Sequence, residues 1–338
     1  MFPTKPFDNW ERRQEHALRH ARVLNDALSD NNHIGCIEWC MTDYATHKDF
    51  GSGDRICYHG VMDSFRNPKD AGYLWASQSD EKEVIHVSSS MDIGDYNGGI
   101  RGKVWIFTNA ERVDVYKNDK KITSLSSSPY SSLPHGPMEF NDTIGNLLEV
   151  DERYDKKKAE RIKDCLNAAV EHGFQNLPLK YVIKLGFIML RYKMTFSDGT
   201  ALFGKYVSGW GGESIKWRFQ GIWNGKEGES GTISPSSTLH LEIKRETSIL
   251  YEGNGYDETL IRIRVLDENN NLAPYAQLPL SIKTSGAIEN AGFDMITLEG
   301  GMGGVIIKTK GEIGKGTLSL SSELGEKEIE FDVRAYDK

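Results

Sequence analysis

The sequence predicts a mixed fold: a fragment of a (β/α)8 barrel followed by two immunoglobulin-like β-sandwich domains, the first with a helical insertion. The first observation is the order of helix, buried strand, polar loop and helix near the N-terminus. The second is an alternation of apolar and polar residues that starts at about residue 83. The third is a series of short apolar runs separated by turn residues near the C-terminus. We therefore expect domains at 1–82, 83–236 and 237–338.

The barrel fragment is predicted from local patterns in the first domain. Residues 8–30 carry apolar side chains at helical spacing on one side, and Asp8 with Glu11 indicates a capping box. The run "IGCIEWCM" (34–41) is almost continuously apolar, which predicts a strand buried on both faces. After a Gly-rich loop, a second helix is expected to start at Pro68. In isolation, the apolar faces of such a fragment would lack partners and stay exposed.

The second domain is expected to be antiparallel β structure with an insertion. Residues 104–122 alternate between apolar and polar side chains around short turns. The insertion at 141–190 carries two apolar helical stripes, the second of them opened by Pro178. Residues 192–207 predict a hairpin that turns at Asp198–Gly199.

Composition limits the classes of partner and cofactor. The 338 residues carry a formal net charge of −8 and no basic block, which disfavours a nucleic-acid partner. No apolar stretch is long enough to span a membrane, and "MFPTKPFDNWERRQEH" lacks the apolar core of a secretory signal, so a cytoplasmic location is expected. We expect no cofactor.

The cysteines raise the question of a metal site. Cys36 and Cys40, with Cys57 and His59, can be written as a zinc pattern. Four residues along a strand span roughly 13 Å, which is too far for two ligands of one tetrahedral ion. Buried free thiols, and no metal, are therefore predicted.

One long segment carries a family resemblance. Residues 35–73, "GCIEWCMTDYATHKDFGSGDRICYHGVMDSFRNPKDAGY", resemble the last strand, loop and final helix of the catalytic barrel in glycoside hydrolase family 2, the β-galactosidase family. Residues 1–27 resemble the stretch before that strand. Residues 104–122 and 257–286 resemble the β domains that follow the barrel.

The resemblance implies a retaining hydrolysis of glycosidic bonds by two carboxylates. In the family both carboxylates lie upstream of the segment that resembles this chain. We therefore assign no catalytic residue and expect the chain alone to be inactive. The predicted function is the C-terminal part of a β-galactosidase-like hydrolase, and the predicted partners are a carbohydrate and either an N-terminal portion or a second copy. The alternative is a non-catalytic module that binds a carbohydrate or a partner.

The predicted substrate-binding residues follow from the same resemblance. Trp39 matches the strand-end tryptophan that lines the family's pocket, and an indole packs well against the C–H face of a sugar. Asp43, Tyr44 and His47 lie just after it, where polar groups can reach hydroxyls. The alternatives are a tryptophan in the barrel core and, for the polar residues, a role in loop structure. Glu38 would face away from Trp39 on a strand and pair with a cation, and the less favoured alternative is a buried general acid with a raised pKa.

Two further patterns are left open. Trp105, Trp210, Trp217 and Trp223 would form either a sugar-stacking platform or parts of the β core, and aromatic residues on short strands are more often core. "GSGDR" (51–55) would either cradle an anion or shape its loop.

Overall fold

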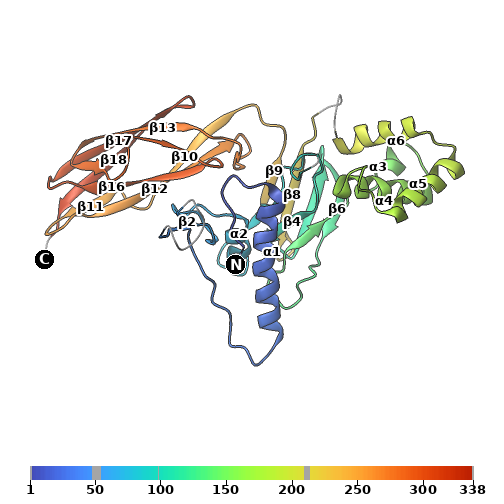
Figure 1. Cartoon of the computed structure of the whole chain (residues 1–338), viewed down its shortest axis with the longest axis horizontal. Helices are drawn as coiled ribbons and strands as arrows, with labels where there is room; N and C mark the ends of the chain where they lie inside the picture. Colours follow the sequence, from blue (N-terminus) through green and yellow to red (C-terminus); the bar gives the residue numbers. More distant parts are fainter. Residues whose placement is uncertain (1, 48–54, 98, 209–213, 337–338) are drawn as a thin grey trace. The chain divides into compact units, whose positions relative to one another are not determined.

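The computed structural model describes residues 2–47, 55–97, 99–208 and 214–336. They form two compact units, drawn in Figure 1. The first unit comprises residues 1–8, 38–69 and 236–338, and the second comprises 9–37 and 70–235.

Two β-sheets with a common apolar core make up most of the first unit. One sheet has the strand order β10-β12-β16-β14 and the other β11-β18-β17-β13-β15. The strands are β10 Leu239–Arg245, β11 Ile249–Glu252, β12 Glu258–Asp267, β13 Pro279–Gly286, β14 Ile288–Asn290, β15 Met295–Thr297, β16 Met302–Thr309, β17 Gly314–Ser322 and β18 Gly325–Ala335. All neighbouring strands are antiparallel except β11 and β18. In β12, the alternate residues Ile261, Ile263 and Val265 are fully buried, as the two-residue period of a strand requires.

The segment 38–69 lies against this pair of sheets. It contains a short hairpin, β1 Tyr44–Ala45 and β2 Ile56–Cys57. Asn67 donates a hydrogen bond to the carbonyl of Gly303 in β16, at 3.1 Å. A Cβ at Gly304 would lie 2.5 Å from the ring of Phe65, so glycine at this position lets the segment pack closely.

The second unit combines β-sheets with helices. Its helices outside the insertion are α1 Trp10–Ser29 and α2 Asp70–Ala76, which pack against each other. The strand orders are β3-β4-β7 and β6-β5-β8-β9, and the two sheets share an apolar core. The strands are β3 Ile85–Val87, β4 Val104–Thr108, β5 Arg112–Lys117, β6 Lys120–Leu125, β7 Met138–Phe140, β8 Trp217–Trp223 and β9 Lys226–Ile233. The predicted antiparallel strands in 104–122 are confirmed.

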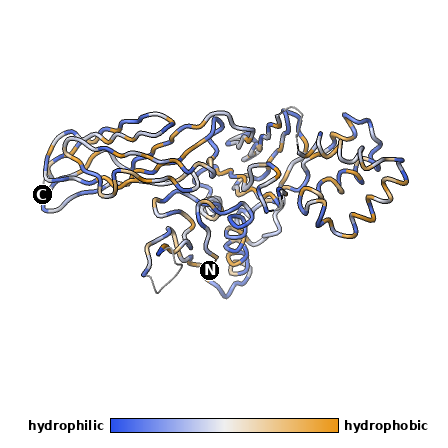
Figure 2. Tube along the Cα trace, turned by 45° about the horizontal axis from the view of Figure 1, so that its top comes forward, coloured by the Kyte–Doolittle hydropathy of each residue, from blue (hydrophilic) through white to orange (hydrophobic). Residues whose placement is uncertain are grey.

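The insertion is helical and has a core of its own. Its helices are α3 Leu147–Val150, α4 Lys156–His172, α5 Leu179–Tyr192 and α6 Phe196–Phe203, followed by the π-helical turn η1 Gly204–Ser208. The two predicted helices are confirmed: α4 ends at Gly173, whose φ of 74° suits glycine, and Pro178 precedes α5. Apolar positions recur along this helical segment in the hydropathy trace of Figure 2.

Three local predictions are wrong. The first is the strand at 34–41, which does not form. Ile34 and Ile37 in this run are almost fully exposed, as expected for apolar side chains without partners. Residues 192–207 form α6 and η1 instead of a hairpin, because Thr195 and Asp198 form a capping box that starts a helix. The cap of α1 is Asn9, whose side chain accepts from the Arg12 amide at 2.9 Å.

Asp8 and Pro68 also differ from their predicted roles. Asp8 closes a turn by accepting a hydrogen bond from the Lys5 amide at 2.7 Å. The helix expected at Pro68 begins two residues later, at Asp70. Both differences move a helix start by one or two residues, because several residue types that favour helix starts stand next to one another at each place.

Candidate functional site

Trp39 and Tyr44 form an exposed aromatic pair in the first unit. The Trp39 side chain is 62% exposed, and its Nε1 donates a hydrogen bond to the Tyr44 hydroxyl at 3.2 Å. The two rings lie edge to face, with centroids 6.4 Å apart and an interplanar angle of 85°. An exposed indole face with a neighbouring phenol is an arrangement that can pack against the apolar side of a ring-shaped polar ligand.

A thiol and an imidazole lie behind Tyr44. Tyr44 and Cys57 are directly opposite in the β1–β2 pair, and Cys57 Sγ lies 2.9 Å from His59 Nδ1. A hydrogen bond with Cys57 is the main cause that raises the pKa of the Tyr44 hydroxyl. Tyr44 is therefore neutral near pH 7 and can both donate and accept hydrogen bonds.

Asp43 is buried and has a structural partner. Its carboxylate contacts Lys69 Nζ at 2.7 Å and accepts a hydrogen bond from the Gly60 amide at 2.9 Å. Burial raises the pKa of the Asp43 carboxyl to about 6, while Lys69 opposes this shift. The structure thus supports a role of Asp43 in loop structure, because its oxygens are already used inside the protein.

Two further features hold the buried ion pair of Asp43 and Lys69 in place. Lys69 Nζ also donates to the carbonyl of Thr4 at 2.7 Å, so it ties the N-terminal residues to the loop. A Cβ at Gly60 would lie 2.3 Å from backbone atoms of Thr42 and Asp43, which leaves room only for glycine. The sequence offers no signal for this pair, since 26 residues separate Asp43 from Lys69.

The remaining predicted residues of this segment are dispersed. His47 is exposed and adjoins residues 48–54, so most of "GSGDR" lies outside the described residues. Glu38 is half-buried, and partial desolvation raises the pKa of its carboxyl. The expectation that Glu38 and Trp39 point to opposite faces of a strand is wrong, because residues 34–41 form no strand.

The cysteines are partly as expected. Cys57 and Cys165 are buried free thiols, whereas Cys36 and Cys40 are half-buried. Across the described ranges, no three His, Cys, Asp or Glu side chains come together as a metal site would need.

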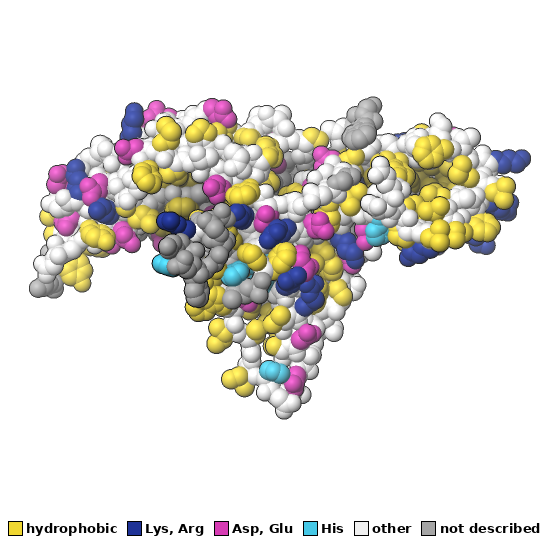
Figure 3. Space-filling view, viewed as in Figure 1, with side chains coloured by type: hydrophobic (Ala, Val, Ile, Leu, Met, Phe, Trp, Pro, Cys, Tyr) yellow, Lys and Arg dark blue, Asp and Glu magenta, His cyan; other side chains and the backbone are white. Residues whose placement is uncertain are grey.

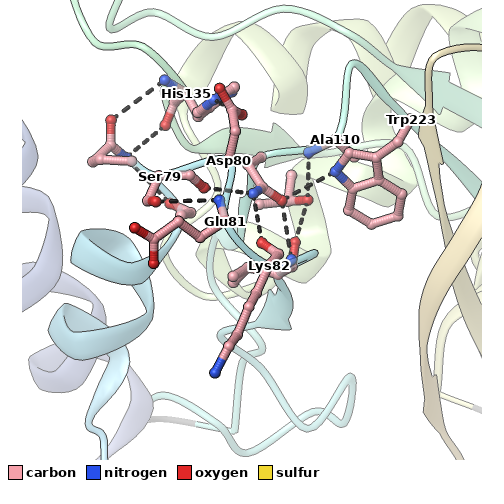
Figure 4. A network of polar contacts seen from close by, with 12 residues as sticks. Ser79, Asp80, Glu81, Lys82, Ala110, His135 and Trp223 are labelled. Atoms are coloured by element: carbon pink, nitrogen blue, oxygen red, sulfur yellow. Dashed lines mark hydrogen bonds and ion pairs between the residues drawn. The ribbon is translucent and has the colours of Figure 1, made fainter.

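Of the four tryptophans considered as a stacking platform, those that the structure describes lie in the β-sheets of the second unit. Trp105 and Trp217 are buried, and Trp210 lies outside the described residues. Trp223, labelled in Figure 4, is half-buried and donates its Nε1–H to Asn109 Oδ1 at 3.1 Å. Because these described indoles face the protein interior, they do not form a stacking platform.

Asn109 is the centre of a polar junction in the second unit (Figure 4). Its Nδ2 donates to the carbonyls of Ser79 and Lys82 at 2.7 and 2.8 Å. Its Oδ1 accepts from the Val84 amide at 3.0 Å as well as from Trp223. The Asn109 amide group is thus occupied by the loop that precedes β3, and it acts in folding rather than in binding.

His135 and Asp80 extend this junction to the surface. His135 Nε2 lies 2.8 Å from an Asp80 oxygen, and Gln78 donates to the His135 carbonyl at 2.8 Å. Sequence reasoning did not single out these residues. No nucleophile lies beside this pair among the contacts of the described residues, so we assign it to the packing of the loop 126–137.

Comparison with known proteins shows what the chain as a whole is similar to. No protein-family model matches the chain. The chain is 28% identical over 339 residues to a β-galactosidase of Thermoanaerobacter pseudethanolicus. This match covers 99% of the chain and 38% of the relative. It is 44% identical over 143 residues to a β-galactosidase of Thermoanaerobacterium thermosulfurigenes, which covers 41% of this chain and 20% of the relative. The chain therefore spans well under half the length of these curated relatives.

Solved structures share the fold of the chain. A β-glycosidase from Bacteroides vulgatus matches 93% of this chain and 32% of its own, with a TM-score of 0.58 and 17% identity. A β-glucuronidase from glycoside hydrolase family 2 matches 96% of this chain and 28% of its own, with a TM-score of 0.59 and 15% identity. The chain therefore shares the fold of part of these two glycoside hydrolases.

The sequence matches agree with the fold in what the chain resembles. Along almost its whole length the chain is similar to a protein named β-galactosidase, which supports its resemblance to the C-terminal portion of glycoside hydrolase family 2 enzymes. The resemblance found in residues 35–73 is confirmed.

Proposed function

We propose that this chain is the C-terminal portion of an enzyme that hydrolyses β-galactosides with retention of configuration. The observation that carries the proposal is the 44% identity over 143 residues to a protein named β-galactosidase. The two catalytic carboxylates belong to the portion of the relatives that the chain does not span, so this chain supplies binding and structural parts.

The contribution of the first unit is proposed to be one wall of the sugar site. Residues 1–82 are proposed to be the end of a (β/α)8 barrel, and residues 237–338 an immunoglobulin-like domain. The exposed apolar run 34–41 supports this assignment, since a barrel strand needs neighbouring strands on both sides to be buried. Trp39 stacks on the sugar, while Tyr44 orients the indole through the hydrogen bond to Trp39 Nε1.

The roles of Asp43 and His47 differ in this proposal. Asp43 supports the loop through Lys69 and does not contact the substrate. His47 is exposed on the same loop as Trp39, which leaves its imidazole accessible to a sugar hydroxyl. We keep His47 as a proposed binding residue.

The test is to join this chain to the missing part of a relative. A chimera of the part of the Thermoanaerobacter pseudethanolicus β-galactosidase that precedes the matched region with residues 1–338 is expected to hydrolyse a chromogenic β-galactoside. The 338-residue chain alone is expected to show no turnover. The full-length relative is the positive control, and a folded chimera without β-galactoside hydrolysis would overturn the proposed activity.

Variants of the chimera test the aromatic wall separately. Trp39→Ala removes a contact of about 1–3 kcal/mol, so kcat/KM is expected to fall about 5- to 100-fold. Tyr256→Ala removes another exposed aromatic residue, 65% exposed, and is expected to change nothing. An active chimera in which Trp39→Ala behaves like Tyr256→Ala would retain the activity but reject Trp39.

A further inference from the structure

The outer face of α5 is an apolar surface that the described residues leave largely exposed, although Phe174 at its edge also packs its ring against Phe203. Figure 3 shows apolar side chains gathered over the helical segment at the right of the molecule. Seven large side chains of this face and its surroundings are between 50% and 81% exposed. We call them the α5 face: Phe174, Leu179, Val182, Ile183, Phe187, Leu190 and Phe196.

Helix α5 is apolar on two opposite sides. At 100° per residue, Ile188, Leu185 and Tyr192 fall on the side that packs into the core of the insertion. Leu179, Ile183 and Leu190 fall on the other side, which is not buried. A helix that is apolar all round normally lies inside a structure, so the outer side of α5 is a surface that calls for a partner.

We propose that the α5 face binds the same face of a second copy of this chain. The seven side chains expose roughly 900 Å², which exceeds the largest apolar patch of a typical monomer and is close to the ~800 Å² that each partner contributes to a stable interface. An isologous contact of this size needs no other protein.

The face is self-complementary about its centre. Gly186 stands in the middle of the stripe, and a Cβ built there meets no atom within 4 Å, so the surface has a dent at this point. In an antiparallel two-fold pair, Phe187 of one copy lies over Gly186 of the other. The same symmetry brings Leu190 of one copy against Ile183 of the other, so large side chains oppose small or branched ones.

The charges of α5 lie beside the face and not within it. No acidic residue occurs in 172–197, while Lys180, Lys184 and Arg191 share one flank of the helix. Lys184 is paired with Asp164 of α4. In the proposed dimer these cations stay at the rim in water, so pairing buries no unpaired charge.

A membrane surface is the other occupant that a basic, apolar helix allows. Helix α5 has 14 residues, and no helix in the described ranges is long and apolar enough to cross a bilayer. The area and the symmetry of the face favour a second copy, and lipid binding is included as an outcome of the test.

The test is the oligomeric state of the full 338-residue chain. Sedimentation velocity and light scattering from about 0.5 to 50 µM are expected to show a dimer that dissociates on dilution. Phe187→Glu is expected to raise the dissociation constant at least about 100-fold without loss of helical circular dichroism, because Phe187 is exposed in the monomer. Phe293→Glu is the matched control, since Phe293 is 83% exposed in the first unit, and it should leave the dimer intact.

The other possible outcomes of this experiment either overturn the proposed dimer or support it. A chain that stays monomeric at 50 µM overturns it, as does a dimer that Phe187→Glu leaves unchanged. Co-sedimentation of a monomer with phosphatidylserine vesicles, abolished by Phe187→Glu, replaces the second copy with a lipid surface. If larger assemblies form, their loss in Phe187→Glu but not in Phe293→Glu supports the proposal. These readouts do not depend on sugar hydrolysis.

Discussion

Two apolar runs of similar composition have opposite fates in this molecule. The run 34–41 is exposed, whereas β4, "VWIFT", is buried at each of its five positions. β4 has β3 on one side and β7 on the other, so its backbone groups are paired and its side chains are covered. At the end of 34–41, the carbonyls of Cys40 and Met41 accept hydrogen bonds from the amides of Val61 and Met62. An apolar run becomes a core strand only where neighbours supply both the backbone partners and the covering side chains.

The largest expected effect is in β4. Ile106→Ala is expected to lower the free energy of unfolding by about 3–4 kcal/mol, because the side chain is fully buried and leaves a cavity. Urea unfolding followed by circular dichroism measures it. A loss below about 1 kcal/mol would mean that burial does not distinguish the two runs.

The second effect concerns the loop that follows the exposed run. Lys69→Met leaves Asp43 buried without its cation and is expected to cost about 3 kcal/mol at pH 8. The pKa of Asp43, already raised to about 6, then rises further above its unfolded value of about 3.9. The folded state therefore prefers the protonated carboxyl, so the stability of the variant is greatest below pH about 4 and is lost as pH rises through the folded pKa.

Urea unfolding of this variant between pH 4 and 8 measures that dependence. The double variant Lys69→Met with Asp43→Asn removes the Asp43 charge and is expected to lack this contribution, so that only the pH dependence of other groups such as His20 is left. The same pH dependence in Lys69→Met and in the double variant would contradict the buried pair.

The third effect concerns His20, a histidine of α1 that is buried in the second unit. Burial lowers the pKa of His20 to about 4 from 6.5, and Trp75 Nε1 donates to His20 Nδ1 at 3.2 Å. The folded state therefore prefers neutral His20, so stability is fully present above pH 6.5 and decreases as pH falls toward 4. The decrease is expected to reach about 3 kcal/mol. Thermal unfolding of His20→Gln should lack this contribution, while the exposed His33→Gln should keep it.

The smallest effect completes the comparison. Ile37→Ala makes the same truncation as Ile106→Ala at an exposed position, and it is expected to change stability by less than about 0.5 kcal/mol. A loss above about 1 kcal/mol in the same urea assay would show that residues 34–41 are covered in solution.

Local patterns predicted the elements whose partners are close in sequence. The two helices of the insertion follow from their apolar stripes, from Gly173 and from Pro178. The start of α6 at Thr195 was also readable, since "TFSD" is a capping-box pattern, but the Asp198–Gly199 pair was interpreted as a hairpin turn. Two local signals competed there, and the helix prevails because Leu202 and Phe203 pack into the core of the insertion.

The candidate site was only partly predictable. Trp39 and Tyr44 were both selected from the sequence, and the structure brings their side chains together. Asp43 was selected with a role in binding or in loop structure, but its partner Lys69 was not predicted, because Lys69 lies far along the chain and no local pattern indicates it. The same limit applies to Asn109, whose four hydrogen bonds join it to two other segments, the loop 79–84 and Trp223 of β8.

The sequence by itself indicated the family resemblance, the β-rich architecture and the helices of the insertion, because motifs and periodicity are properties of neighbouring residues. Only the tertiary structure decided which apolar surfaces are covered, which carboxylate is occupied and which face of α5 is exposed. Those outcomes depend on contacts between residues distant in the chain, and such contacts leave no regular spacing to read.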